Sequence, residues 1–207
     1  MIIENNVESS KLESSQDYVE ESGLKSIPNF HSKYFVANEI ADSPSEGVCF
    51  VAIDLAGAAA IRDYIECKCK SLSLSDQAVF EISLIADELV SNAIVATYNQ
   101  GKKDDVIFRW KIDDTVIKLS VFDVGGGITD LKKMMERKKV QSYSITMPNA
   151  GRAMNYTKSG TGLRIVDSLS KEMDVSYYND RGEASKVYDS EVLGTIITVS
   201  YVHSGLN

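Results

Sequence analysis

A glutamate and an asparagine, Glu88 and Asn92, stand four residues apart within an apolar stretch of the chain. On a helix, residues at positions i and i+4 share one face, so both side chains would point to the same side. The carboxamide oxygen of Asn92 suits Mg²⁺, a hard cation that prefers oxygen ligands. The carboxylate of Glu88 could accept a proton from an attacking hydroxyl or water. The pair indicates magnesium and phosphate chemistry rather than zinc, and the plain alternative is a solvated helix face.

A second group of candidates follows a predicted apolar strand. Asp123 ends that strand, and Gly125 and Gly127 come directly after it. A carboxylate accepts hydrogen bonds, and the N6 amine of adenine is a donor. Glycines allow the backbone to approach a base or a ribose closely and to take a positive φ. The group is consistent with an adenine site, and the plain alternative is an ordinary strand-to-loop turn.

A third group, Ser159-Gly160-Thr161-Gly162-Leu163, opens a predicted apolar helix. Backbone N–H groups at a helix N-terminus, unobstructed by a Cβ, suit a phosphate, although a flexible loop end would look similar. The pattern is not a GxxxxGK[ST] phosphate loop, and it is not a Rossmann turn because no strand directly precedes it. In this order, the three groups predict a site for ATP and a divalent ion.

Helices and strands that could position these groups are visible in the hydrophobic periodicity. Helices are expected at residues 56–72, from the N-cap candidate Ser75-Asp76 to about residue 98, and at 162–173. The second helix should bury a stripe formed by Ile82, Ile85, Ala86, Leu89 and Ala93. The third helix should turn four residues inward, namely Leu163, Val166, Leu169 and Met173. Strands are expected at residues 48–53, 106–112, 115–122, 175–178 and 194–202, with a short strand at 185–188.

The order of these elements favours one fold class. Strands come in hairpins and helices come together, which predicts an α+β sandwich with helices on one face of a mixed, mostly antiparallel sheet, rather than a βαβ repeat. Residues 128–158 are rich in Lys, Ser, Met, Asn and Gly, and we expect a long irregular loop there, which is usually functional or mobile. Its basic cluster, Lys132-Lys133 and Arg137-Lys138-Lys139, is typical of a solvated face rather than a phosphate contact.

The composition excludes several classes of protein. The chain has 207 residues, enough for one well-buried domain, and a net charge of -8, which argues against binding nucleic acid or anionic membranes. His31 and His203 lie outside the three groups, so a histidine-based catalytic site is not expected. Three cysteines without a CxxC pair argue against a disulfide framework or a zinc site and favour reduced thiols in a cytoplasmic protein.

The ends of the sequence suggest how the chain is organised. Residues 1–45 are expected to form an acidic, flexible N-terminal extension, and residues 46–207 the main domain. The first residues lack the basic and apolar regions of a signal peptide. No apolar run reaches about 18 residues, so no membrane span is expected.

Taken together, the three groups resemble the ATP-binding domain shared by DNA gyrase, a heat-shock chaperone, histidine kinases and the MutL mismatch-repair ATPases, called the GHKL or Bergerat fold. The resemblance covers about residues 45–202: 88–93 resemble its N box, 123–127 its first glycine box and 160–163 its second. It implies a two-layer α/β sandwich with an ATP lid at about 128–159, and ATP and Mg²⁺ as cofactors. Glu88 would be the catalytic residue and Asn92 the metal ligand. Nucleotide contacts would come from Asn92, Asp123, Gly125, Gly127, Lys158, Gly160, Thr161, Gly162 and Leu163.

Within that family, the chain is most similar to the anti-sigma factor serine kinases of bacterial partner-switching systems. Their N box typically continues as Asn-Ala-Ile-x-His-x-Tyr, and here it reads Asn92-Ala-Ile-Val-Ala-Thr-Tyr98. Ser159-Gly160-Thr161-Gly162 resembles their second glycine box. Two positions depart from related patterns: Ala96 replaces the usual His, and Arg164 stands where sensor histidine kinases commonly have another Gly.

This resemblance implies a cytoplasmic serine/threonine-protein kinase that phosphorylates a STAS-type antagonist of an anti-sigma factor, or sequesters a sigma factor, or does both. Glu88 would orient or deprotonate the incoming serine hydroxyl, and Lys158 or Arg152 would steady the phosphate charge. It also allows a homodimer. Two alternatives stay open: a nucleotide-binding interaction module without useful catalysis, and a histidine-kinase catalytic domain. No histidine-bearing helix pair precedes residue 45, which disfavours the second alternative.

Overall fold

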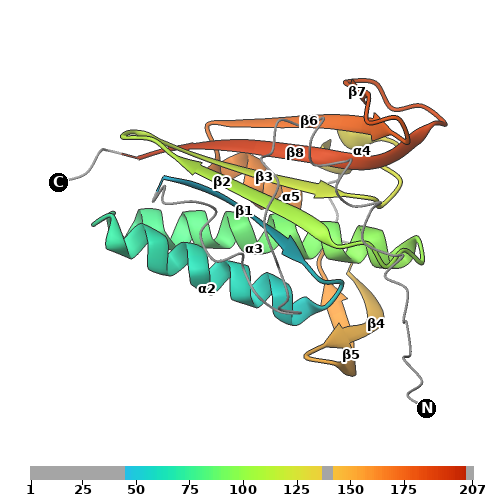
Figure 1. Cartoon of the computed structure of the whole chain (residues 1–207), viewed down its shortest axis with the longest axis horizontal. Coiled ribbons are helices and arrows are strands. Elements are labelled where there is room, and N and C mark those ends of the chain that lie inside the picture. Colours follow the sequence, from blue (N-terminus) through green and yellow to red (C-terminus); the bar gives the residue numbers. More distant parts are fainter. Residues whose placement is uncertain (1–44, 137–141, 204–207) are drawn as a thin grey trace, which may run out of the picture. The chain divides into compact units, whose positions relative to one another are not determined.

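The computed structural model describes residues 45–136 and 142–203 (Figure 1). The predicted N-terminal extension lies outside the described residues except for its last residue. The basic stretch Arg137-Lys138-Lys139 also lies outside them. The division into an extension and a main domain therefore stays a prediction.

One six-stranded sheet forms the framework, in the order β1-β2-β3-β8-β6-β7. Each neighbouring pair among these strands is antiparallel. The strands are β1 (Glu46–Val51), β2 (Val106–Ile112), β3 (Val116–Asp123), β6 (Glu172–Asn179), β7 (Ala184–Ser185) and β8 (Val192–Val202). The sheet therefore confirms the predicted mostly antiparallel α+β fold, although the short strand predicted at 185–188 is reduced to two residues.

Two long helices, α2 (Leu55–Ser71) and α3 (Asp76–Asn99), run side by side along one face of the sheet (Figure 1). A third helix, α5 (Gly162–Leu169), packs on α3. Side chains cap the first two helices: Asp54 Oδ1 accepts a hydrogen bond from the N–H of Ala56 at 2.9 Å, and Ser75 Oγ accepts one from Ala78 at 3.3 Å. The predicted N-cap at Ser75 is therefore confirmed.

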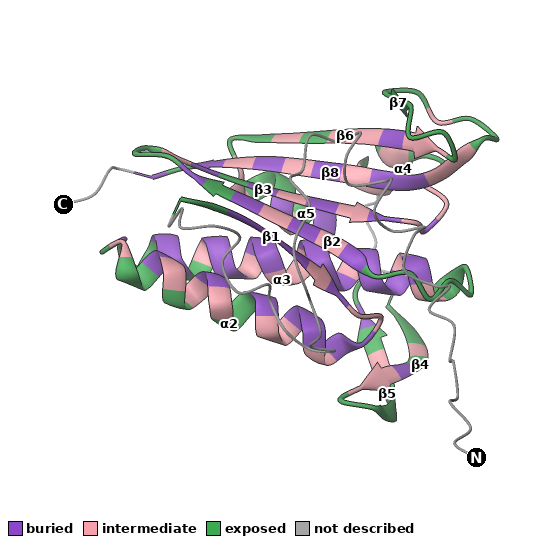
Figure 2. Cartoon of the chain, viewed as in Figure 1, coloured by how far each residue is buried: buried purple, intermediate pink, exposed green. Residues whose placement is uncertain are grey.

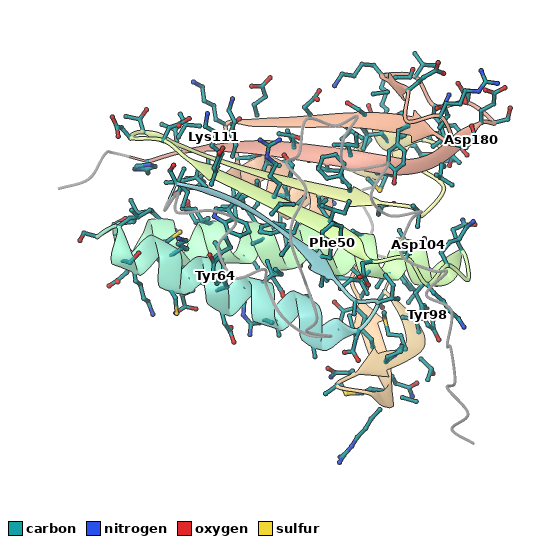
Figure 3. The ribbon with its side chains drawn as sticks, in the orientation of Figure 1. Phe50, Tyr64, Tyr98, Asp104, Lys111 and Asp180 are labelled. Atoms are coloured by element: carbon teal, nitrogen blue, oxygen red, sulfur yellow. The ribbon has the colours of Figure 1, made fainter. Side chains whose placement is uncertain are left out.

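The core lies between the sheet and these helices (Figure 2). On β2, Phe108 and Trp110 are buried and Lys111 is exposed, as alternation along a strand requires. Tyr64 of α2, labelled in Figure 3, packs edge-on against Trp110 with ring centroids 5.2 Å apart. The stripe predicted for α3 is fully buried and comprises Ile82, Ile85, Ala86, Leu89 and Ala93. Burying each of its larger apolar side chains stabilises the fold by about 1.5–3 kcal/mol, which fixes the rotation of α3 about its axis.

The segment predicted as one long irregular loop contains regular structure in its described part, so that prediction is wrong there. Helix α4 spans Leu131–Glu136, and β4 (Tyr143–Asn149) pairs with β5 (Arg152–Lys158) in a separate hairpin. Strand β5 therefore directly precedes Ser159, so the expectation that no strand stands there is wrong. Most of the hairpin is polar and exposed on both faces, so it lacks the alternation that reveals a half-buried strand. Hydroxyl and amide pairs across the strands, such as Thr146 Oγ1 to Asn155 Oδ1 at 2.7 Å, contribute instead.

Helix α5 is shorter than predicted. Leu163 and Val166 are buried as expected, but the helix ends at Leu169 and Met173 lies on β6. The chain becomes extended at Ser170, and the N–H of Lys171 then donates to the carbonyl of Ser200 on β8 at 2.8 Å. The chain therefore pairs with β8 instead of continuing the helix. No helix in the described part of the chain is long and apolar enough to cross a membrane.

Candidate functional site

A cavity of about 230 Å³ lies where α3, the ends of β3 and β8, and the start of α5 meet. It is lined by Lys158 and by members of all three sequence groups, namely Asn92, Asp123, Gly127, Gly160, Gly162 and Leu163. These residues span more than seventy positions in the sequence, and the fold brings them to one place. Glu88, Gly125 and Thr161 border this group through the contacts described below.

Glu88 lies next to Lys158, which lines the cavity. Lys158, the last residue of β5, is only 5% exposed, and its Nζ donates a hydrogen bond to Ser91 Oγ at 2.7 Å. The same Nζ lies 3.8 Å from Glu88 Oε2, which makes an ion pair rather than a hydrogen bond. On α3, Ser91 and Asn92 lie about one turn after Glu88, so one side of the helix presents a carboxylate, a hydroxyl and an amide.

Burial lowers the pKa of Lys158 to about 8, and the nearby carboxylates of Glu88 and Asp87 oppose that shift. Two buried polar atoms next to this lysine, Glu88 Oε2 and Asn92 Nδ2, have no hydrogen-bond partner among the described residues. Buried polar groups without partners are costly, and they are typical of sites that receive a ligand. The oxygen-bearing side chains of Glu88 and Asn92 suit a hard cation, so the residues present fit Mg²⁺.

Gly162 allows α5 to begin directly against this pair. A Cβ at position 162 would lie 2.1 Å from Glu88 Oε2 and 3.1 Å from Asn92 Nδ2, closer than packed atoms approach. The N-terminus of α5 therefore lies beside the carboxylate and the amide because residue 162 has no side chain. Such a terminus carries unsatisfied N–H groups and favours negative charge.

The residues before this helix take separate positions. Gly160 has a φ of 70°, a left-handed conformation that glycine adopts without strain. Thr161 is the N-cap residue, but its hydroxyl lies 2.6 Å from that of Ser159 and does not cap α5. Leu163 is 8% exposed and contributes an apolar wall. Of the predicted group Ser159–Leu163, Gly160, Gly162 and Leu163 line the cavity, whereas Ser159 and Thr161 do not.

Asp123 also lines the cavity. It is 5% exposed, and Oδ1 accepts a hydrogen bond from the N–H of Gly125 at 2.7 Å. Burial raises the pKa of Asp123 to about 7, while hydrogen bonds from the backbone of Gly125 and Thr195 oppose that shift. Apolar side chains line the same cavity, including Leu89, Val121 and Ile197, and such walls suit a flat base.

The two predicted glycines of this loop are required for different reasons. Gly127 has a φ of 79°, so the predicted positive φ is confirmed there. Gly125 does not have a positive φ, so that prediction is wrong there. It is needed for space instead, since a Cβ there would lie 2.5 Å from the Cβ of Ala96. Ala96 is the position where the resemblance led us to expect His, and the loop that contains Gly125 packs directly against it.

Arg152, the alternative phosphate contact, does not lie at the cavity. It is exposed at the start of β5, and Lys158 ends the same strand six positions further along, about 20 Å away at the usual rise per residue. Sequence reasoning also missed Ser91 and Thr195, which contact Lys158 and Asp123 respectively. Ser91 was detectable as the residue one turn beyond Glu88, whereas Thr195 carries no local signal because it reaches Asp123 through strand pairing.

Comparison with known proteins identifies a matching family and several curated relatives. The family model described as "Histidine kinase-like ATPase domain" matches residues 51–187. Among curated relatives, the chain is 32% identical over 95 residues to "Anti-sigma F factor" of Lysinibacillus sphaericus, covering 46% of this chain and 58% of the relative. It is 30% identical over 102 residues to "Anti-sigma F factor" of Geobacillus stearothermophilus and 26% identical over 102 residues to that of Bacillus subtilis (strain 168), covering 49% of this chain and 62% of each relative.

The chain thus spans about three fifths of the length of the curated relatives it matches. The family match is wider, since residues 51–187 make up more than half of the chain and include all three sequence groups. An ATPase domain of this kind implies nucleotide binding, in agreement with the cavity described above. On the strength of that match and of the predicted α+β fold, the chain belongs to the histidine kinase-like ATPase family.

Proposed function

We propose that the chain is an ATP-dependent protein serine/threonine kinase that regulates a transcription partner in the cytoplasm. Its protein substrate would be a STAS-type antagonist, and the same protein would bind a sigma factor. Support for these partners comes from its curated relatives, which are named anti-sigma F factors. The nucleotide would then bias which partner is bound, through a difference in affinity between the two nucleotide states.

At the base end, Asp123 would accept a hydrogen bond from the N6 amine of adenine, and Gly127 would let the base approach the backbone. The apolar walls of the cavity suit the ring system of a base, and the carboxyl of Asp123 would fix the orientation of that base. At the phosphate end, Asn92 would hold Mg²⁺ together with the phosphates. The start of α5, with Gly160 and Gly162, would present N–H groups to the phosphate oxygens.

Bound Mg²⁺ would supply charge neutralisation at the phosphates. Lys158 would add a fixed positive charge where negative charge spreads in phosphoryl transfer. Glu88 would accept the proton of the incoming serine hydroxyl. At the same time the serine oxygen would bond to the γ-phosphorus, and ADP would depart. The observation that carries this proposal is the group of Glu88, Asn92 and Lys158 at the N-terminus of α5, with two buried polar atoms that lack partners in the described chain.

The proposal predicts a specific effect of Glu88→Gln. Phosphate transfer to a STAS-type antagonist should fall by at least about 100-fold, because a general base contributes at least that much. The affinity for Mg-ATP should change little, since the base acts in the transition state. Transfer is measured with γ-labelled ATP, and affinity by calorimetry. Glu81→Gln is the matched control, because Glu81 lies on the same helix and accepts a hydrogen bond from Tyr201, away from the cavity.

Different outcomes separate the candidate functions. Transfer by Glu88→Gln at the rate of the natural protein would contradict the role of Glu88. Tight Mg-ATP binding without transfer to any antagonist would favour the nucleotide-binding interaction module. Phosphohistidine after incubation with ATP would favour a histidine kinase. Pull-downs from the source cell, with and without ATP, would identify the partner and test whether the nucleotide controls it.

A further inference from the structure

The loop of residues 123–128, here called the glycine loop, is held by two tyrosines from β6. Tyr178 donates a hydrogen bond from its hydroxyl to the carbonyl oxygen of Asp123 at 2.6 Å. Tyr177 donates one to the carbonyl oxygen of Ile128 at 3.1 Å. The two ends of the loop are therefore each tied to β6, a strand that pairs with β8 and not with β3.

The two hydroxyls reach the loop from different sides. Successive residues of a strand point to opposite faces of the sheet, and Tyr177 is only 5% exposed while Tyr178 is half-buried. The pairing of β6 with β8 shifts register between Tyr178 and Asn179. Such an irregularity commonly changes the direction of a side chain, and here it lies next to Tyr178, whose hydroxyl reaches Asp123.

Neighbouring glycines leave the space that these contacts need. A Cβ at Gly194 would lie 1.7 Å from the carbonyl oxygen of Asp123 and 2.7 Å from the hydroxyl of Tyr178. A Cβ at Gly127 would lie 2.9 Å from Tyr188, whose ring packs edge-on against that of Tyr177 at 5.6 Å. The middle of the glycine loop is also tied, because the N–H of Gly126 donates to the carbonyl of Leu193 at 3.0 Å.

These contacts fix the backbone of the glycine loop at both ends and in the middle, and Asp123 at its start carries the carboxyl that lines the cavity. We propose that Tyr178, supported by Tyr177, is a positioning residue that holds the Asp123 carboxyl for selection of adenine over guanine. This inference rests on the proposed nucleotide site. Adenine offers an N6 amine to the carboxylate, whereas guanine has an oxygen acceptor at the equivalent position. A carboxylate that is held in place repels the oxygen of guanine and so weakens guanine binding. A carboxylate that can move aside weakens guanine binding less.

The test compares Tyr178→Phe and Tyr177→Phe with Tyr201→Phe. Tyr201 lies on β8, and its hydroxyl donates to Glu81 of α3 at 2.7 Å, so its loss removes one hydrogen bond away from the glycine loop. Calorimetry gives the Kd values for Mg-ATP and Mg-GTP, and thermal unfolding gives Tm for each variant. Tyr178→Phe should reduce the preference for ATP over GTP by about 5-fold, which corresponds to the loss of one ordinary hydrogen bond. Tyr177→Phe should reduce it in the same direction, and Tyr201→Phe should leave it unchanged while lowering Tm.

An unchanged preference for ATP in both Tyr178→Phe and Tyr177→Phe would overturn the inference. An equal loss of preference in Tyr201→Phe would also overturn it, because the effect would then follow general stability. If the kinase activity is present, Tyr178→Phe should raise the KM for ATP and leave kcat unchanged. Failure of the natural protein to bind Mg-ATP would instead overturn the proposed function itself.

Discussion

At the scale of single residues, the unusual side chain is Lys158, a buried charge at the end of a polar hairpin. Removing a charge from water is costly unless other groups solvate it, and here Ser91 and Glu88 do so. The hydroxyl of Ser91 accepts a hydrogen bond from the ammonium group and so favours its charged form. The ability of this lysine to meet a phosphate should therefore depend on pH and on Ser91.

The affinity for Mg-ATP should fall as pH rises through about 8, because the pKa of Lys158 is lowered to about 8 and the charged form is lost above it. Lys158→Met should weaken binding by about 10- to 100-fold below pH 8 and abolish that fall, since a hydrogen bond to a charged group is lost. Ser91→Ala should move the fall to lower pH. Calorimetry between pH 6.5 and 9.5 measures all three.

Lys186→Met is the control for this experiment, because Lys186 is an exposed lysine that pairs with Asp174 on the sheet. A pH profile of Lys158→Met that matches the natural protein would contradict the assignment of Lys158.

The lowered pKa of Lys158 also has a consequence for folding. The unfolded chain binds the proton between pH 8 and the ordinary value of 10.5 while the folded chain does not, so the Lys158 contribution to the free energy of unfolding rises over that window.

At the scale of elements, one carboxylate connects a helix to the hairpin that carries Lys158. Asp54 is 5% exposed and caps α2 through Ala56. It also accepts hydrogen bonds from the N–H groups of Ala150 at 2.8 Å and Gly151 at 2.9 Å, at the turn between β4 and β5. Both turn residues have positive φ, 51° and 76°, which points their N–H groups to one side. The tip of the hairpin is thus tied to the start of α2.

Asp54→Asn should loosen the hairpin, because the amide nitrogen that replaces one carboxylate oxygen cannot accept a hydrogen bond. The free energy of unfolding should fall by about 1–3 kcal/mol. Amides of residues 143–158 should exchange faster with deuterium, as measured by mass spectrometry. Asp130→Asn is the control, since Asp130 also accepts a backbone hydrogen bond, from Lys133, but is exposed. Unchanged exchange in the hairpin of Asp54→Asn would contradict this role of Asp54.

At the scale of the whole molecule, folding, protonation and nucleotide binding are linked through Asp123. Burial raises the pKa of Asp123 from 3.8 to about 7 in the folded chain. Between these two values the folded chain holds a proton that the unfolded chain has lost. The Asp123 contribution to the free energy of unfolding therefore falls as pH rises from about 4 to 7. A ligand amine that donates to the carboxylate would favour its charged form.

Mg-ATP binding near pH 6 should therefore release up to one proton from Asp123. Calorimetry in buffers of different ionisation enthalpy measures that release. Thermal unfolding should show a smaller decline in Tm between pH 4.5 and 7 for Asp123→Asn than for the natural protein. Asp113→Asn, at an exposed position in the β2–β3 turn, provides the control. Binding without proton release in the natural protein would contradict the link between Asp123 and the base.

Much of this arrangement could be predicted from local pattern. The buried stripe of α3 follows helical spacing, and the alternation of β2 follows strand spacing, so both elements were predictable. Ser75 was a recognisable N-cap. The β4–β5 hairpin was not predictable in this way, because polar residues face water on both of its sides and leave no period to detect. The end of α5 was also not predictable, because pairing with β8 decides it.

By itself, the sequence determined the elements and the chemical types of the site, because helix and strand periodicity and the glycine and carboxylate groups are local properties. The tertiary structure alone decided which groups meet. Lys158 contacts Ser91 across 67 positions, Ala150 contacts Asp54 across 96, and Tyr178 contacts Asp123 across 55. Contacts at such separations depend on how helices and strands pack, and no local pattern encodes that packing. The physical reason is that a side chain's partner is set by the three-dimensional core, whereas its conformation is set mainly by its neighbours in the chain.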